Sequence, residues 1–405
     1  MKLINRPTTG KIAEIGDDIR SLPFNSLIQR IYAGRGVHSV DELQFNLKQL
    51  LPVSALSHVQ AAAELLADNL QQQTNILIIG DFDADGATAT AVACRALRLM
   101  GGKNIDYLVP NRFEYGYGLT PEIVKTAQGF SPDLIVTVDN GVSSIEGVRV
   151  ARKQGIKVLV TDHHLPGKEL PDADVMVNPN LQDDSFPSKA LAGVGVIFYV
   201  MLALKRCLQD REYFSEQSII PPNLLTLLDL VALGTVADVV PLDMNNRILV
   251  EQGLRRVRAG QGCVGIQALF EIAGKNASRA VATDFGFTCG PRLNAAGRLD
   301  DMSLGIECLL TDSIQEAREI ASALNDLNIE RRIIETDMKE QAMQELELLD
   351  LRTSDQQPAV YCLYNENWHQ GVVGILASRI KEMFNRPVIA FAPVENEGQI
   401  TEIKG

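Results

Sequence analysis

Acidic and imidazole side chains that could hold divalent cations stand where short apolar segments of the sequence end. They are Asp81, Asp83 and Asp85 after residues 76–79, Asp139 after 134–138, Asp162, His163 and His164 after 157–160, and Asp238 at the end of a buried helical segment. Carboxylates gathered in one cleft repel each other and lose hydration, so a fold tolerates them when cations compensate. Carboxylate with imidazole suits Mn²⁺ or Mg²⁺. Two such ions ~3.5–4 Å apart can activate a water and stabilise the leaving oxygen of a phosphoryl transfer.

Each motif taken alone also has a simpler structural interpretation, but none accounts for the whole set. A lone aspartate after a strand is often a turn or helix-capping residue. The run from Asp81 to Gly86 matches the start of a calcium loop, but that loop needs a glutamate at its twelfth position, where this chain has Val92. The sequence contains no phosphate-binding P-loop, dinucleotide fingerprint, zinc-protease or nucleophile-elbow motif. A shared metal site is therefore favoured.

Alternating strand and helix patterns surround these motifs. Continuous apolar runs predict strands at 76–79, 105–109, 134–138, 157–160 and 174–177, and helical patterns separate them at 87–100, 121–128 and 144–154. Such alternation predicts a parallel sheet covered by helices on both faces. Active sites of open parallel sheets lie at the carboxyl ends of the strands, where the acids stand.

The expected α/β fold is divided into four parts along the chain. The sequence predicts a small helical segment at residues 1–60 and the sheet domain at 61–245. It predicts a helical region that ends in a long connecting helix at 246–350, and a partial second α/β domain at 351–405. The second domain is expected to contain a strand at 359–364, a helix at 374–384 and a strand at 388–391.

Composition limits the class of protein. The chain has 405 residues, 46% of them hydrophobic, and a net charge of −13 that does not indicate a nucleic-acid binder, although bound cations would reverse the local sign. No apolar run approaches the ~18 residues of a membrane span, which predicts no membrane association. Six scattered cysteines without a Cys-x-x-Cys pair favour free thiols in the cytoplasm.

Taken together, the four acidic motifs resemble the DHH phosphoesterases in order and context. Longer strings are similar to the bacterial single-strand-specific DNA exonucleases of that family: residues 80–88, 109–113, 193–195, 290–298 and 369–375. The resemblance covers nearly the whole chain. It implies a 5′-to-3′ exonuclease of recombination and repair that acts on single-stranded DNA with two Mn²⁺ or Mg²⁺ ions. It also implies a single-strand-binding protein and a repair helicase as partners.

The same resemblance implies roles for the motif residues. Asp139 would bridge the two ions, while Asp83, Asp85, His163 and Asp238 would be terminal ligands. Asp81 would either bind an ion directly or contact the ligands without binding an ion itself. His164 would lie near the scissile phosphate and assist the leaving group. The mechanism would be in-line attack of a metal-activated water, without a covalent enzyme intermediate.

Candidate phosphate contacts lie elsewhere in the sequence. Arg292, Asn294 and Arg298 fall in a glycine-rich segment that predicts a loop, and guanidinium groups bind phosphate bidentately. Arg112 follows a strand end, and His369 precedes a helix whose N-terminus favours anions. Surface ion pairs are the alternative for these arginines. Trp368 could stack on a base or pack in a core, and the arginines at 247, 255, 256 and 258 could follow a nucleic-acid backbone or form a solvated helix face.

One departure from the family pattern keeps other functions open. In the family, the second domain continues with Gly-Arg-Ser and Gly-Gly-His motifs and an oligonucleotide-binding barrel, whereas this sequence stops at Gly405. We therefore expect a chain shortened at its C-terminus. The alternatives are a DHH phosphodiesterase that acts on short oligonucleotides or small nucleotides, and a catalytically incompetent or scaffolding chain.

Overall fold

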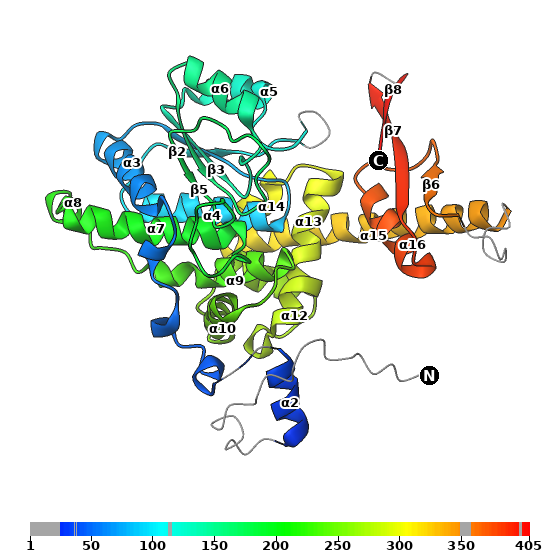
Figure 1. Cartoon of the computed structure of the whole chain (residues 1–405), viewed down its shortest axis with the longest axis horizontal. Helices are drawn as coiled ribbons and strands as arrows, with labels where there is room; N and C mark the ends of the chain where they lie inside the picture. Colours follow the sequence, from blue (N-terminus) through cyan, green and yellow to red (C-terminus); the bar gives the residue numbers. More distant parts are fainter. Residues whose placement is uncertain (1–24, 36, 38, 112–115, 349–357, 397–398) are drawn as a thin grey trace.

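The computed structural model describes residues 25–35, 37, 39–111, 116–348, 358–396 and 399–405. Its larger unit contains a sheet of five parallel strands in the order β2-β1-β3-β4-β5. The sheet lies in the upper left part of the view in Figure 1. The strands are β1 (Ile76–Ile79), β2 (Ile105–Leu108), β3 (Leu134–Val138), β4 (Lys157–Thr161) and β5 (Val175–Val177). All five lie where the apolar runs predict them, so the expected α/β class is confirmed.

Helices cover both faces of this sheet, and the central strands are buried on both sides. The helices between strands are α4 (Ala84–Leu99), α5 (Pro121–Ala127) and α6 (Ile145–Lys153), and α3 (Val59–Gln72) precedes β1. Ile76 and Ile78 face the core that contains α3 and α4, whereas Leu77 and Ile79 face the core under α5 and α6. This alternation is the period of two expected for a strand. Thr120 caps α5 through its hydroxyl.

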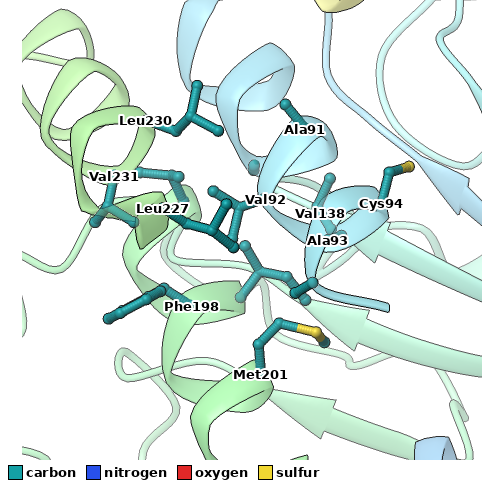
Figure 2. Close-up of a cluster of buried hydrophobic side chains, with 14 of the residues drawn as sticks. Ala91, Val92, Ala93, Cys94, Val138, Phe198, Met201, Leu227, Leu230 and Val231 are labelled. Atoms are coloured by element: carbon teal, nitrogen blue, oxygen red, sulfur yellow. The ribbon is translucent and has the colours of Figure 1, made fainter. Parts of the chain in front are cut away.

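Buried helices follow the sheet and complete the larger core. Val92 of α4, Phe198 of α7 and Leu230 of α9 meet there, with Met201 and Val231 alongside (Figure 2). The helices of this part are α7 (Gly193–Asp210), α8 (Tyr213–Glu216), α9 (Leu228–Ala237), α10 (Met244–Arg258), α11 (Val264–Ile272), α12 (Ala282–Asp284), α13 (Gly290–Leu299) and α14 (Ser303–Leu310). The short turn η5 (Leu224–Leu227) precedes α9.

The segment 290–298 is helix α13, and the prediction of a loop there is wrong. A π-helical turn, η7 (Phe285–Cys289), leads into it. The glycines serve close packing: a side chain at Gly297 would come within 1.8 Å of the Phe82 carbonyl oxygen. The helix thus lies directly against the loop that carries the first acidic motif.

The long helix α15 (Ile314–Leu348) leads from the larger unit to a second, smaller one, as Figure 1 shows. That unit contains β6 (Tyr361–Tyr364), α16 (Val373–Phe384), β7 (Val388–Asn396) and β8 (Gln399–Lys404), with β6 parallel and β8 antiparallel to β7. The sequence pattern did not predict β8. Trp368 is buried against Ala342 of α15, and its Nε1 donates to Gln341. Packing, and not base stacking, is therefore its role.

The N-terminal part contains α2 (Ser26–Gly34) and the short turns η1 (Asp41–Leu43), η2 (Leu47–Gln49) and η3 (Val53–Ala55). Among the described helices, none is by itself both long and apolar enough to cross a membrane; the bent pair Leu47–Ala55 and Val59–Gln72 meets that test of length and composition only when the two are taken together.

Candidate metal centre

The loop after β1 folds its aspartates around the start of α4. Oδ1 of Asp83 accepts hydrogen bonds from the amides of Asp85 (2.9 Å) and Gly86 (3.0 Å), so Asp83 is the N-cap of this helix. Oδ1 of Asp81 accepts from the Phe82 amide at 2.7 Å. A side chain at Gly86 would come within 2.6 Å of Asp81, so only glycine fits there. The tight turn therefore brings these carboxylates to one end of the strand.

Asp85 joins α4 to α7 through both of its oxygens. Oδ2 accepts from the Gly193 amide at 2.7 Å, and Oδ1 accepts from the Val194 amide at 3.0 Å. The residue is 1% exposed. Two donors from a helix N-terminus stabilise the carboxylate, because these amides have no partner within their own helix. Oδ2 also lies 3.9 Å from Nε2 of His163, so the same group faces the other motifs.

Asp139 stands directly after β3 in the left-handed backbone region, with φ of +62°. Its amide donates to the Thr161 carbonyl of β4 at 3.0 Å, which extends the pairing of the two strands by one residue. The side chain is buried against Gly193, where any Cβ would lie 2.5 Å from Oδ1. Positive φ is uncommon outside glycine and asparagine or aspartate, and such strain persists at functional positions.

The third motif follows β4 and orients two imidazoles differently. Oδ1 of Asp162 lies 2.7 Å from Nδ1 of His164 and also accepts from the amides of both histidines. His163 instead directs Nε2 towards Asp139 (3.1 Å to Oδ1) and Asp238 (3.6 Å to Oδ2). Asp162 is thus a carboxylate that holds the motif in place, while His163 joins the acids.

These side chains form three overlapping groups whose ligand atoms lie within 4.8 Å of one another. The groups are Asp81 with Asp83 and Asp139, Asp85 with His163 and Asp238, and Asp139 with both histidines. Oδ1 of Asp139, Nε2 of His163 and Oδ2 of Asp238 are buried without a hydrogen-bond partner in the described part of the chain. Buried polar atoms are nearly always satisfied, so this set suits a cation ligand. The donors are oxygen and imidazole, which fits Mn²⁺ or Mg²⁺.

Burial and mutual repulsion perturb the acids strongly. Burial, followed by repulsion from Asp83, raises the pKa of Asp81 and of Asp85 to about 7. Burial and then repulsion from Asp85 raise the pKa of Asp238 to about 7, and the same two causes raise the pKa of Asp139 well above its usual range. Acids that hold protons to neutral pH indicate a site made for a compensating positive charge.

The two histidines are shifted in opposite directions. Burial lowers the pKa of His163, which favours the neutral imidazole that a metal ion requires. The hydrogen bond to Asp162 raises the pKa of His164 to about 9, against the effect of burial. His164 therefore carries a positive charge at neutral pH, and its side chain is 45% exposed.

The candidate phosphate contacts fall on α13 and before α16. Oδ1 of Asn294 accepts from the Ala84 amide at 2.7 Å, so it braces the start of α4. The Arg292 guanidinium donates to the Thr288 carbonyl at 2.7 Å and to Asn325. Nη1 of Arg298 donates to the Gly371 carbonyl at 3.2 Å, and Nδ1 of His369 accepts from the Gly371 amide. Arg112 lies outside the described residues.

Three residues near the site were not identified from the sequence. Nδ2 of Asn178 donates to the His164 carbonyl at 2.9 Å, and Nδ2 of Asn180 donates to the His163 carbonyl. Both follow β5, so the polar residues after that strand carried the same signal as the acids after the other strands. The Tyr117 hydroxyl lies 3.4 Å from both Nδ1 of His164 and the Asp139 carbonyl oxygen. No pattern in the sequence distinguishes it.

The chain is similar to proteins of the DHH class. A model described as the DHH family, N-terminal domain, matches residues 75–235, which include the first three acidic motifs and end three residues before Asp238. The single-stranded-DNA-specific exonuclease RecJ of Escherichia coli (strain K12) is 56% identical over 379 residues, which are 93% of this chain and 66% of that protein. The corresponding RecJ of Dickeya dadantii (strain 3937) is 56% identical over 97% of this chain and 67% of its own length.

Solved structures agree with these relatives. A crystal structure of exonuclease RecJ bound to manganese is 36% identical with a TM-score of 0.71, over 84% of this chain and 81% of that one. RecJ of Thermus thermophilus in complex with Mn²⁺ is 33% identical with a TM-score of 0.75, over 94% of this chain and 52% of that one. The chain therefore belongs to the RecJ family of DHH proteins, and it spans about two thirds of the length of its bacterial relatives from Escherichia coli and Dickeya dadantii.

Proposed function

We propose that this chain hydrolyses the phosphodiester bonds of single-stranded DNA from the 5′ end, with two Mn²⁺ or Mg²⁺ ions. The observation that carries the proposal is the set of three unsatisfied buried atoms, Oδ1 of Asp139, Nε2 of His163 and Oδ2 of Asp238. The relatives named above are single-stranded-DNA-specific exonucleases, and two of the solved structures contain manganese. A role in recombination and repair follows from the same kinship.

The residues at the strand ends would hold the two ions. Asp139 belongs to two of the three ligand groups, so it is the carboxylate suited to bridge them. Asp83, Asp85, His163 and Asp238 would be terminal ligands, and Asp81 completes the group around Asp83. Bound at this position, the ions would supply an activated water and neutralise charge on the phosphate.

His164 is suited to hold a proton beside the scissile phosphate. Its Nδ1 is engaged with Asp162, which leaves the proton on Nε2 for a phosphate or leaving-group oxygen. Because Asp162 raises the pKa of His164 to about 9, that proton is present at neutral pH. We therefore assign His164 the stabilisation of charge on the leaving group.

Further side chains would hold the strand. Arg292 and Arg298 lie on α13, whose Asn294 contacts the first acidic motif, and His369 lies just before α16. We assign phosphate contacts to these residues and to Arg112.

The boundaries 1–60, 61–245, 246–350 and 351–405 remain our proposed domain division. The proposed setting is the cytoplasm, together with a single-strand-binding protein and a repair helicase, and the six cysteines are unpaired, as a reducing compartment requires.

A digestion assay tests the proposal. We expect mononucleotides from unblocked single-stranded DNA only when Mn²⁺ or Mg²⁺ is present, no product from 5′-blocked DNA, and none from Asp139→Asn. Asp210→Asn at the exposed end of α7 removes one surface carboxylate and serves as the matched control. Survival of the DNA while a dinucleotide is cleaved would leave the metal site in place and change the substrate class.

That second substrate class has support of its own. A cavity of about 570 Å³ borders His164 and is lined by Tyr117, Thr120 and Ser144. This volume falls in the usual range for small-ligand sites. Cleavage of short oligonucleotides or small nucleotides is therefore the alternative function. A chain that cleaves neither substrate would be catalytically incompetent or a scaffold.

A further inference from the structure

Val239, the residue after Asp238, combines backbone strain with exposure. Its φ is +62°, and 84% of the residue is exposed. A β-branched side chain in the left-handed region is a genuine outlier. Strain of this kind persists where the surroundings fix it, often at binding sites. The strained turn presents an apolar side chain to solvent directly beside the candidate metal centre.

The same loop leads to a second cavity, separate from the one beside His164. Leu242, four residues after Asp238, lines a space of about 640 Å³ together with Arg247. The opposite wall comes from the N-terminal part of the chain and includes Tyr32, Arg35 and Phe45. Four peptide units span at most ~15 Å, so the wall that contains Leu242 lies within a few nucleotides of the metal centre.

The charged side chains that line this cavity are those of two arginines, Arg35 and Arg247. Nε of Arg247 donates to the Leu242 carbonyl at 2.9 Å, which fixes the guanidinium at the cavity wall. Within the described part of the chain, neither Arg35 nor Arg247 forms an ion pair. Asp243, next to Leu242 in the sequence, is engaged through Oδ1 with the Asn246 amide and through Oδ2 with the Ser188 hydroxyl. Two such guanidiniums beside an apolar cavity favour an anion with an apolar part.

We propose that Val239 and this cavity bind the single strand where it extends beyond the metal centre, with a base in the apolar cavity and phosphates on Arg35 and Arg247. The inference rests on the proposed function and adds a strand-binding surface to it. Aromatic side chains combined with cations are the usual means of holding single strands without sequence preference. An acidic peptide would also fit the charges, but the loop from Asp238 connects this cavity to the metal centre, which favours the strand.

The test measures binding without catalysis. Fluorescent (dT)20 is titrated with the whole chain in EDTA at several salt concentrations. For the double variant Arg35→Gln/Arg247→Gln we expect about 5- to 50-fold weaker binding. The slope of log affinity against log salt should also fall by about 1.4, since each phosphate contact on a single strand contributes about 0.7. The control Arg206→Gln/Arg318→Gln removes two exposed arginines that have acidic partners and should change neither quantity.

A second variant separates base contacts from charge. Phe45→Leu should weaken binding of (dT)20 and leave binding of an abasic 20-mer unchanged. Absence of (dT)20 binding, or an unchanged salt slope in the double variant with thermal unfolding intact, would overturn the inference. If the double variant no longer binds a glutamate-rich, tryptophan-containing decapeptide that the unaltered chain binds, while its binding of DNA is unchanged, the cavity is a peptide site instead.

The outcomes for the two proposals are distinguishable. If the variants weaken strand binding while no DNA is ever cleaved, the strand surface stands and the nuclease function falls. If a trinucleotide is cleaved with Mn²⁺ and the variants bind (dT)20 as the unaltered chain does, the nuclease function stands and the strand surface falls.

Discussion

Nε2 of His163 lies 3.1 Å from Oδ1 of Asp139, and within the described part of the chain neither atom has a hydrogen-bond partner. Oδ2 of Asp238 lies 3.6 Å from the same nitrogen and also has no hydrogen-bond partner among the described residues. Leaving a buried polar atom unsatisfied destabilises a fold by about 1–3 kcal/mol. Three such atoms from three separate segments therefore represent a ligand site that the fold maintains at the expense of its own stability.

Replacing Asp139 with asparagine should separate metal binding from folding. Asparagine tolerates the positive φ and has nearly the same shape, but it removes a buried carboxyl group whose ionisation the neighbouring acids oppose. We expect Mn²⁺ affinity to fall at least about 100-fold by calorimetry, while the urea midpoint of the metal-free chain at pH 8 rises. A lower midpoint would mean that Asp139 stabilises the fold and contradicts the metal assignment.

Much of the architecture could be predicted because burial determines it locally. Strands such as Leu134–Val138 are apolar on both faces, which only a sheet covered by helices can accommodate. The carboxyl ends of parallel strands share one edge, so Asp139 and His163 could be expected to meet from their positions in the sequence alone.

What could not be predicted depends on contacts between distant segments. Gly290 and Gly297 suggested a loop, yet they allow α13 to approach Ala237 and the Phe82 carbonyl closely. A glycine needed for close packing and a glycine needed for flexibility look identical in a sequence. The bracing of His163 by Asn180 likewise depends on where β5 ends in space.

The stability of the metal-free chain should fall as pH rises from 5 to 8. Asp81, Asp85 and Asp238 have pKa values raised to about 7 by burial and then by acidic neighbours, against 3.8 when exposed. The folded state thus retains protons that the unfolded state releases, so their contribution is complete below about pH 4 and lost above pH 7. His164, with its pKa raised to about 9, acts in the same direction.

Two groups modify this trend without reversing it. His163 opposes it below its normal pKa of 6.5, because burial lowers its pKa, and Asp162 is already ionised throughout the range. Urea unfolding in EDTA should show a clear loss of stability between pH 5 and 8, to which a single such carboxyl contributes about 2–3 kcal/mol. Adding Mn²⁺ at pH 8 should restore the stability. A metal-free chain whose stability is equal at both pH values would contradict the raised pKa values.

Asp162→Asn should change the protonation of His164. The hydrogen bond to the carboxylate raises the pKa of this histidine to about 9, and a neutral amide supports the imidazolium far less. NMR titration of the His164 ring should show its pKa falling below 8. The rate of strand cleavage at pH 8 should fall about 10- to 100-fold, with a smaller loss at pH 6.5, where His164 regains its proton. A uniform loss at both pH values would indicate a structural role for Asp162 alone.

Gly193→Ala tests whether close packing holds the bridging carboxylate in place. Gly193 begins α7, where alanine suits the backbone, but its Cβ would lie 2.5 Å from Oδ1 of Asp139. The clash should displace that carboxylate, and it should also disturb the amide that donates to Asp85. We expect about 1–3 kcal/mol of destabilisation in urea and a clear loss of Mn²⁺ affinity. Gly374→Ala, in α16 with open space around it, should leave both unchanged or raise stability slightly. Full Mn²⁺ affinity in Gly193→Ala would show that Asp139 can move without loss of the site.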